Sequence, residues 1–77
     1  MIGYEFWRDR TGRVWAVKLV AGDVTGACGP LAGAQVDASR LPTYDYDDVA
    51  GARIQRQREH FLPVSELELI LLSAETD

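Results

Sequence analysis

The chain has 77 residues, of which 47% are hydrophobic and 26% charged, a balance typical of one small globular domain spanning residues 1–77. Its single cysteine cannot form an internal disulfide, and with one histidine it offers too few ligands for a structural zinc site, so we expect no metal and no cofactor. The net charge of −4 argues against a protein that works mainly by coating nucleic acid, because phosphate neutralisation requires a cationic face.

The first thirty residues predict an antiparallel meander. Its three strands are expected at 3–8, 13–20 and 24–29. The turn between the first two strands starts with Asp9 and ends with Gly12, residue types that suit those positions of a type I turn. A four-residue loop of this kind pairs Phe6 with Trp15. Because side chains alternate along a strand, one set is expected to share the core face: Tyr4, Phe6, Trp15, Val17 and Leu19.

The register of the third strand has two solutions. A two-residue turn at 22–23 places Val24 and Cys28 on the core face, whereas a three-residue turn places Thr25 and Ala27 there. The sequence leaves both open.

Pro30 is expected to end the third strand or to confine it to a sheet edge. Residues 31–49 show no clean period and predict a long connecting loop, which is uncommon in a small domain, so the segment either contains a short element or is a functional loop. Residues 50–61 fit two structures equally well. They predict a helix capped by Asp47 or Asp48, or a strand with alternate apolar residues at its start.

The C-terminal segment predicts a buried strand at 67–72, followed by a frayed tail at 73–77. The spacing of Ser65 and Glu68 is that of a capping box, which makes a helix the competing prediction. The layout resembles that of SH3-like small barrels, and the expected fold is a small mostly-β domain whose meander closes toward such a barrel. The alternative is an α+β domain with the meander, one helix at about 48–61 and a C-terminal strand.

No catalytic signature is present, so we expect no catalytic residue and lean against an enzyme. Nothing in the sequence brings His60 near Cys28 as a base for a thiol nucleophile. If Trp7 is exposed, it is a candidate hot spot for binding a protein or for stacking on bases. If the sheet closes into a barrel or is covered by residues 50–61, Trp7 belongs to a second core. The tyrosines and aspartates near residue 45 are typical of a contact surface, unless they fold back over the core. The candidate binding residues are Trp7, Arg8, Arg10, Arg13, Tyr44, Asp45, Tyr46 and Asp47.

These features favour a non-enzymatic binding or accessory module that acts through protein–protein contacts, with a protein partner or with itself as a homo-oligomer. The first alternative is nucleic-acid binding through Arg8, Arg10 and Arg13 together with Trp7. The second is an acidic inhibitor or mimic that blocks a nucleic-acid enzyme. No apolar run reaches the length of a membrane span, so we expect no membrane partner and a cytoplasmic location. Arginine outnumbers lysine seven to one, a skew that resembles chains encoded in GC-rich DNA, so we expect a bacterial or phage source.

Overall fold

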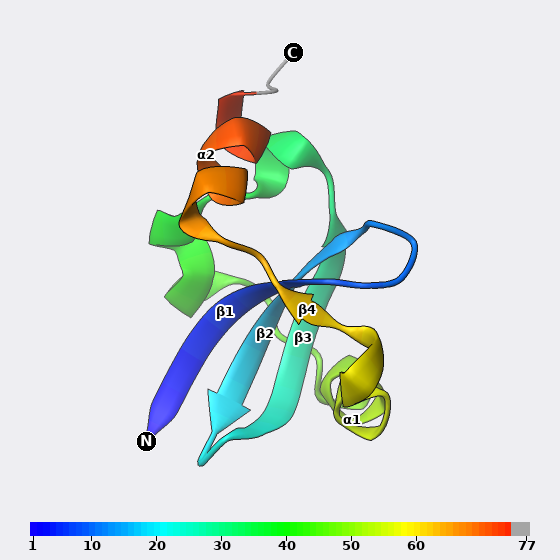
Figure 1. The fold of residues 1–77 in the computed structure, drawn as a ribbon. Coiled ribbons are helices and arrows are strands. Elements are labelled where there is room, and N and C mark those ends of the chain that lie inside the picture. Colours follow the sequence, from blue (N-terminus) through cyan, green and yellow to red (C-terminus); the bar gives the residue numbers. More distant parts are fainter. Residues whose placement is uncertain (75–77) are drawn as a thin grey trace.

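A four-stranded antiparallel sheet forms the centre of the computed structural model, which describes residues 1–74 (Figure 1). The predicted meander is present as β1 (Ile2–Arg8), β2 (Val14–Val20) and β3 (Asp23–Leu31), and a two-residue strand, β4 (Leu62–Pro63), pairs with β1. The strand order β3-β2-β1-β4 leaves the sheet open. Closure into an SH3-like barrel is therefore not found within residues 1–74, and the α+β alternative fits better.

Within residues 1–74, two α-helices and three short 3₁₀ helices accompany the sheet. They are η1 (Gly33–Gln35), η2 (Ala38–Thr43), α1 (Asp48–Arg56), η3 (Arg58–His60) and α2 (Glu66–Ala74). The predicted loop at 31–49 thus contains η1 and η2. The helix predicted for 50–61 is confirmed as far as Arg56, where α1 ends, and Arg58–His60 form the separate η3. Asp47 is the N-cap of α1, because its carboxylate accepts a hydrogen bond from the Ala50 backbone N–H at 2.8 Å.

The predicted C-terminal strand at 67–72 is wrong, because this segment lies within α2. The competing helix prediction is confirmed by its cap, since Ser65 Oγ accepts a hydrogen bond from the Glu68 backbone N–H at 3.2 Å. A strand at 67–72 has no place beside β1, because β4 already pairs with that edge. Leucine and glutamate, which make up most of the segment, are strong helix formers. Of the expected frayed tail, Ser73 and Ala74 belong to α2, and residues 75–77 lie outside the described part.

The predicted register between the first two strands is wrong by one residue. Trp7 pairs with Trp15 and Phe6 with Ala16, so the turn holds five residues instead of four. As a result Trp15 and Val17 lie on the face of Trp7, opposite Phe6. The expected single core face does not exist.

The third strand follows neither predicted register. Its turn lies one residue earlier, at Ala21 and Gly22, whose φ angles of 53° and 87° fit a type I′ turn. A register shift between Lys18 and Leu19 then places Val24 and Ala27 on the same face, where both are buried. The strand continues past Pro30 at the sheet edge, as one of the two expectations for this proline required.

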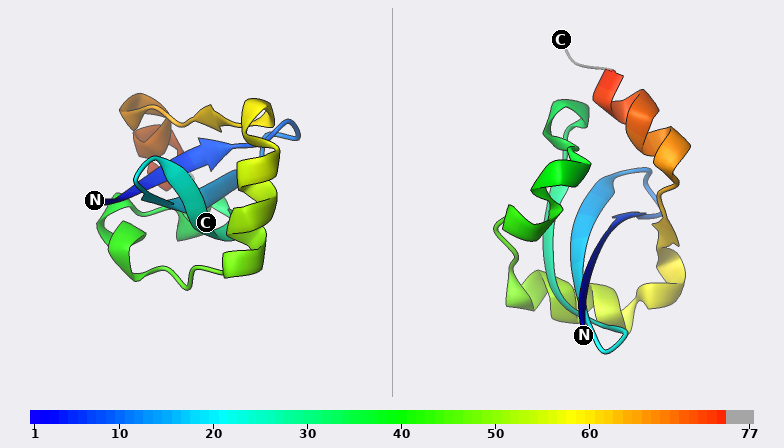
Figure 2. Two further views of the ribbon diagram at one scale, coloured as in Figure 1. Left: turned by 90° about the horizontal axis from the view of Figure 1, so that it is seen from below. Right: turned by 90° about the vertical axis from the view of Figure 1, so that its left-hand side faces the viewer.

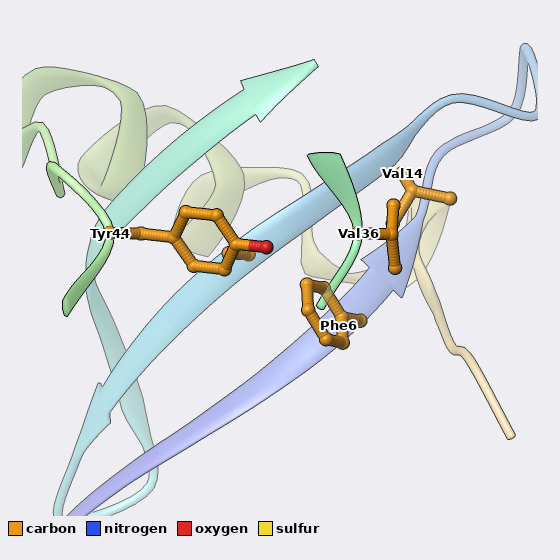
Figure 3. Close-up of a cluster of buried hydrophobic side chains, with 5 residues drawn as sticks. Phe6, Val14, Val36 and Tyr44 are labelled. Atoms are coloured by element: carbon orange, nitrogen blue, oxygen red, sulfur yellow. The ribbon is translucent and has the colours of Figure 1, made fainter. Parts of the chain in front are cut away.

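Both faces of the sheet are covered (Figure 2). Figure 3 shows the first cluster, in which residues following β3 close over β1 and β2. Its buried members are Phe6, Val14, Ala16, Val36 and Tyr44. The second cluster lies under α1 and consists of Trp7, Val17, Val24, Ala27 and Ile54. A strand buried on both sides reads as a continuous apolar run, which explains why alternation did not identify the core.

The start of α1 is joined to β3 through backbone. Asp47 and Ala27 exchange two hydrogen bonds, of 3.1 and 2.8 Å, on the outer side of β3. One turn later Gly51 lies directly on β3, where an added Cβ would come within 2.3 Å of the Gly26 nitrogen. The helix therefore sits as close to the sheet as backbone atoms permit.

Candidate functional site

Trp7, the central residue of the predicted binding surface, is buried, with 6% of its surface exposed. Its indole N–H donates to Glu5 Oε1 at 2.8 Å, and the Arg58 guanidinium lies 5.3 Å from the ring centroid. The Phe61 ring packs on it with centroids 6.4 Å apart. The core interpretation of Trp7 is confirmed, and its ring is not available to stack on a base.

The three arginines near the first turn do not form one cationic surface. Arg8 pairs with Glu68 of α2, with 2.7 Å between guanidinium and carboxylate, and so helps to hold that helix. Arg10 and Arg13 are exposed. Neither has a carboxylate partner among the ion pairs of residues 1–74.

Tyr44 and Tyr46 fold back over the core, as one of the two interpretations of this segment required. The Tyr44 hydroxyl donates to the Gln35 carbonyl and accepts from the Asp37 backbone N–H at 3.0 Å. The Tyr46 hydroxyl donates to the carbonyl of Leu41. Burial, reinforced by nearby Tyr4, Cys28 and Tyr44, raises the pKa of Tyr46 above its ordinary value, so this hydroxyl stays protonated.

Of the aspartates in the same segment, Asp45 and Asp48 are exposed, while Asp47 serves α1 as its cap. In residues 1–74 no group of three His, Cys, Asp or Glu side chains is placed to hold a metal ion. Cys28 packs against the cluster of Phe6, whereas His60 lies near Ile54 on the other side of the sheet. The structure therefore does not bring the thiol and the imidazole together.

Among the residues whose burial is described, three exposed large apolar side chains lie together on α2. Leu67, Ile70 and Leu71 are 67%, 65% and 59% exposed, and their i, i+3, i+4 spacing places them on one side of the helix. We call these three residues the α2 apolar surface. The prediction of a strand here missed them, although an unbroken apolar run after a capping box is a usable signal for a helix that lacks a polar face.

The opposite side of α2 is fixed to the domain by two contacts. Leu69 packs against the cluster of Phe6. Glu68 pairs with Arg8. The exposed leucines and isoleucine are thus held outward by a helix that is anchored along its inner side.

A second surface feature is an open pocket of about 350 Å³ between the first turn and the end of α1. Its lining includes Asp9, Arg10, Trp15, Arg53, His60 and Phe61. Of the predicted site residues, only Arg10 contributes to it. The incorrect register concealed the pocket, since it placed Trp15 on the other side of the sheet.

The turn that forms one wall of the pocket is organised by the Asp9 carboxylate. Oδ1 accepts from the Thr11 hydroxyl at 2.6 Å and from the backbone N–H groups of Thr11 and Arg13, while Oδ2 accepts from the Trp15 indole at 3.0 Å. Desolvation opposes ionisation of Asp9, but these hydrogen bonds outweigh it and lower its pKa to about 2. The carboxylate is ionised, and both of its oxygens accept hydrogen bonds.

No family model matches the chain, and neither a curated protein nor a solved structure is found to be similar to it. No helix within residues 1–74 is long and apolar enough to cross a membrane. The functional argument therefore rests on the two surfaces described above.

Proposed function

We propose that this protein is a non-enzymatic binding module that docks on a protein partner through the α2 apolar surface. The observation that carries the proposal is the outward side of α2, where Leu67, Ile70 and Leu71 are each more than half exposed. Fully burying one such side chain is worth about 1.5–3 kcal/mol, so a groove that accepts all three gains several kcal/mol. Apolar anchors at i, i+3 and i+4 are the usual pattern for a helix that binds in a groove.

Charge argues for a partner rather than for a second copy. Glu66 lies on α2 without a partner among the ion pairs of residues 1–74, and the sequence has no lysine or arginine after Arg58. Two copies packed through this surface would bring like charges together, which costs free energy. The partner we propose therefore carries an apolar groove rimmed by lysine or arginine.

Site-specific photo-crosslinking in the native cells tests this proposal. A photoreactive amino acid at Ile70 is expected to give a covalent adduct with one partner protein. The yield of this adduct should fall with added salt, because salt weakens the binding that precedes crosslinking. The same group at Val49, which is 77% exposed on α1, is the matched control. An adduct at Ile70 no stronger than at Val49 contradicts the proposal, and an adduct of twice the chain mass shows that the occupant is a second copy.

The alternative functions stay predictions. Nucleic-acid binding through Arg8, Arg10 and Arg13 with Trp7 needed an exposed tryptophan, and Trp7 is buried. The net charge of −4 favours the hypothesis of an acidic mimic, but no particular arrangement of side chains supports it.

A further inference from the structure

The open pocket between the first turn and α1 combines cations with aromatic walls. Arg10 comes from the turn and Arg53 from α1, and both are exposed. Neither guanidinium has a carboxylate partner among the ion pairs of residues 1–74. Asp9, the acid in the lining, keeps its negative charge, since its four hydrogen bonds come from neutral donors, and the two arginines together exceed it. In a protein of net charge −4, this pocket therefore has a positive balance.

The aromatic wall is held in a fixed position. The indole N–H of Trp15 is bound to Asp9, and its six-membered ring lies against Gly29, where an added Cβ would come within 3.1 Å of Cε3. Trp15 and Phe61 are both half-buried, and both line the pocket. With its N–H already used, the indole can offer a ligand only its ring surface, which is suited to a planar apolar group.

We propose that this pocket binds a nucleotide, with the base on the Trp15 and Phe61 side and the phosphate between Arg10 and Arg53. Two guanidinium groups from different elements suit a terminal phosphate, whose three oxygens can accept from both at once, better than a carboxylate, whose two oxygens one guanidinium fills. The volume of about 350 Å³ lies at the small end of the range for ligand sites. This inference is independent of the α2 apolar surface, which belongs to a different helix.

The experiment is an NMR titration of the whole protein with AMP, read at the Trp15 indole N–H, which the variant Trp15→Phe assigns. AMP at up to about 5 mM is expected to shift this resonance, as suits a weak ligand of an open pocket. Adenosine and inorganic phosphate, which each carry half of the ligand, should bind more weakly. No shift with AMP, or equal affinity for adenosine, overturns the proposal.

Arginine variants distinguish binding of AMP in the pocket from a general attraction of AMP to positive charge. Arg10→Gln and Arg53→Gln should each weaken AMP binding by about tenfold, the effect of one lost charge-assisted hydrogen bond. Arg13→Gln is the matched control, because Arg13 is exposed in the same turn but does not line the pocket. Equal weakening in all three variants overturns the proposal.

A last titration, with a deoxyadenosine hexamer, distinguishes a free nucleotide from a nucleotide within single-stranded nucleic acid. Tighter binding than AMP at the same resonances supports a site for single-stranded nucleic acid, with the affinity falling as salt rises. Tighter binding of AMP supports a free nucleotide. If the hexamer shifts resonances of residues outside the pocket and leaves the Trp15 indole unchanged, the proposed site is wrong.

Discussion

A single carboxylate decides which face of the sheet Trp15 occupies. The segment 9–12 has a good sequence for a four-residue turn, yet the turn closes around Asp9 with one residue more, because Asp9 Oδ1 accepts the Arg13 backbone N–H at 3.0 Å and Oδ2 accepts the Trp15 indole. The sequence predicts the turn, but not its length. The length depends on side-chain hydrogen bonds, which residue preferences at turn positions do not encode.

Asp9→Asn is expected to lower the free energy of unfolding at pH 7 by about 1 kcal/mol, after allowance for solvent screening, because an amide cannot accept all four hydrogen bonds. The folded pKa of Asp9 is depressed from 3.8 to about 2, so its stabilisation is present above pH 3.8 and is lost as the pH falls toward 2. Urea unfolding followed at pH 7, 4 and 2.5 should show wild type and variant converging at low pH. Asp45→Asn, at an exposed carboxylate, is the control, and a difference that does not change with pH contradicts the prediction.

The two helices differ in how far the sequence reveals them. α1 can be predicted from its local sequence, because Asp47 is a suitable cap and helix formers follow it. α2 does not, since an apolar run such as 67–72 suits a buried strand or a helix equally. The choice depends on Leu62–Pro63 pairing with β1, a contact between residues more than fifty positions apart that no local pattern shows.

Gly51→Ala is expected to destabilise the protein by about 3 kcal/mol, through overpacking of α1 against the backbone of Gly26. Helix propensity predicts the opposite sign, since alanine is favoured over glycine by about 1 kcal/mol within a helix. Chemical denaturation with tryptophan fluorescence measures the difference. The neighbouring Ala52→Gly, at an exposed position of the same helix, should cost only the propensity, and a stabilised Gly51→Ala would disprove the close approach.

The molecule as a whole divides its core into two thin layers that share one sheet. Ile54 closes one layer from α1, and Tyr44 closes the other from the segment after η2. The meander could be predicted from the sequence, because strand formers and turn residues alternate in its first thirty positions. The layer that Tyr44 closes over Phe6 could not be predicted, because its closure relies on the irregular segment 31–47, which has no periodicity.

Phe6→Ala and Ile54→Ala remove one buried side chain from each layer and should each destabilise the protein by about 3–4 kcal/mol. Since a domain of this size has a total stability of about 5 kcal/mol, both variants should lie near the unfolding threshold. We expect the two layers to be coupled and to unfold together, so circular dichroism and fluorescence should report the same transition. Val49→Ala, at an exposed position, is the control, and a variant in which amide exchange shows one layer protected and the other open contradicts this coupling.

The paired backbone of Asp47 and Ala27 has a consequence for the behaviour of partly unfolded chains. Asp47 both caps α1 and occupies hydrogen-bonding groups on the outer edge of β3. Detachment of this segment would uncover an apolar sheet face and an unpaired strand edge in the same event, the combination that recruits strands of other chains into aggregates. Exposure of this face and edge therefore depends on the stability of one nine-residue helix and its cap.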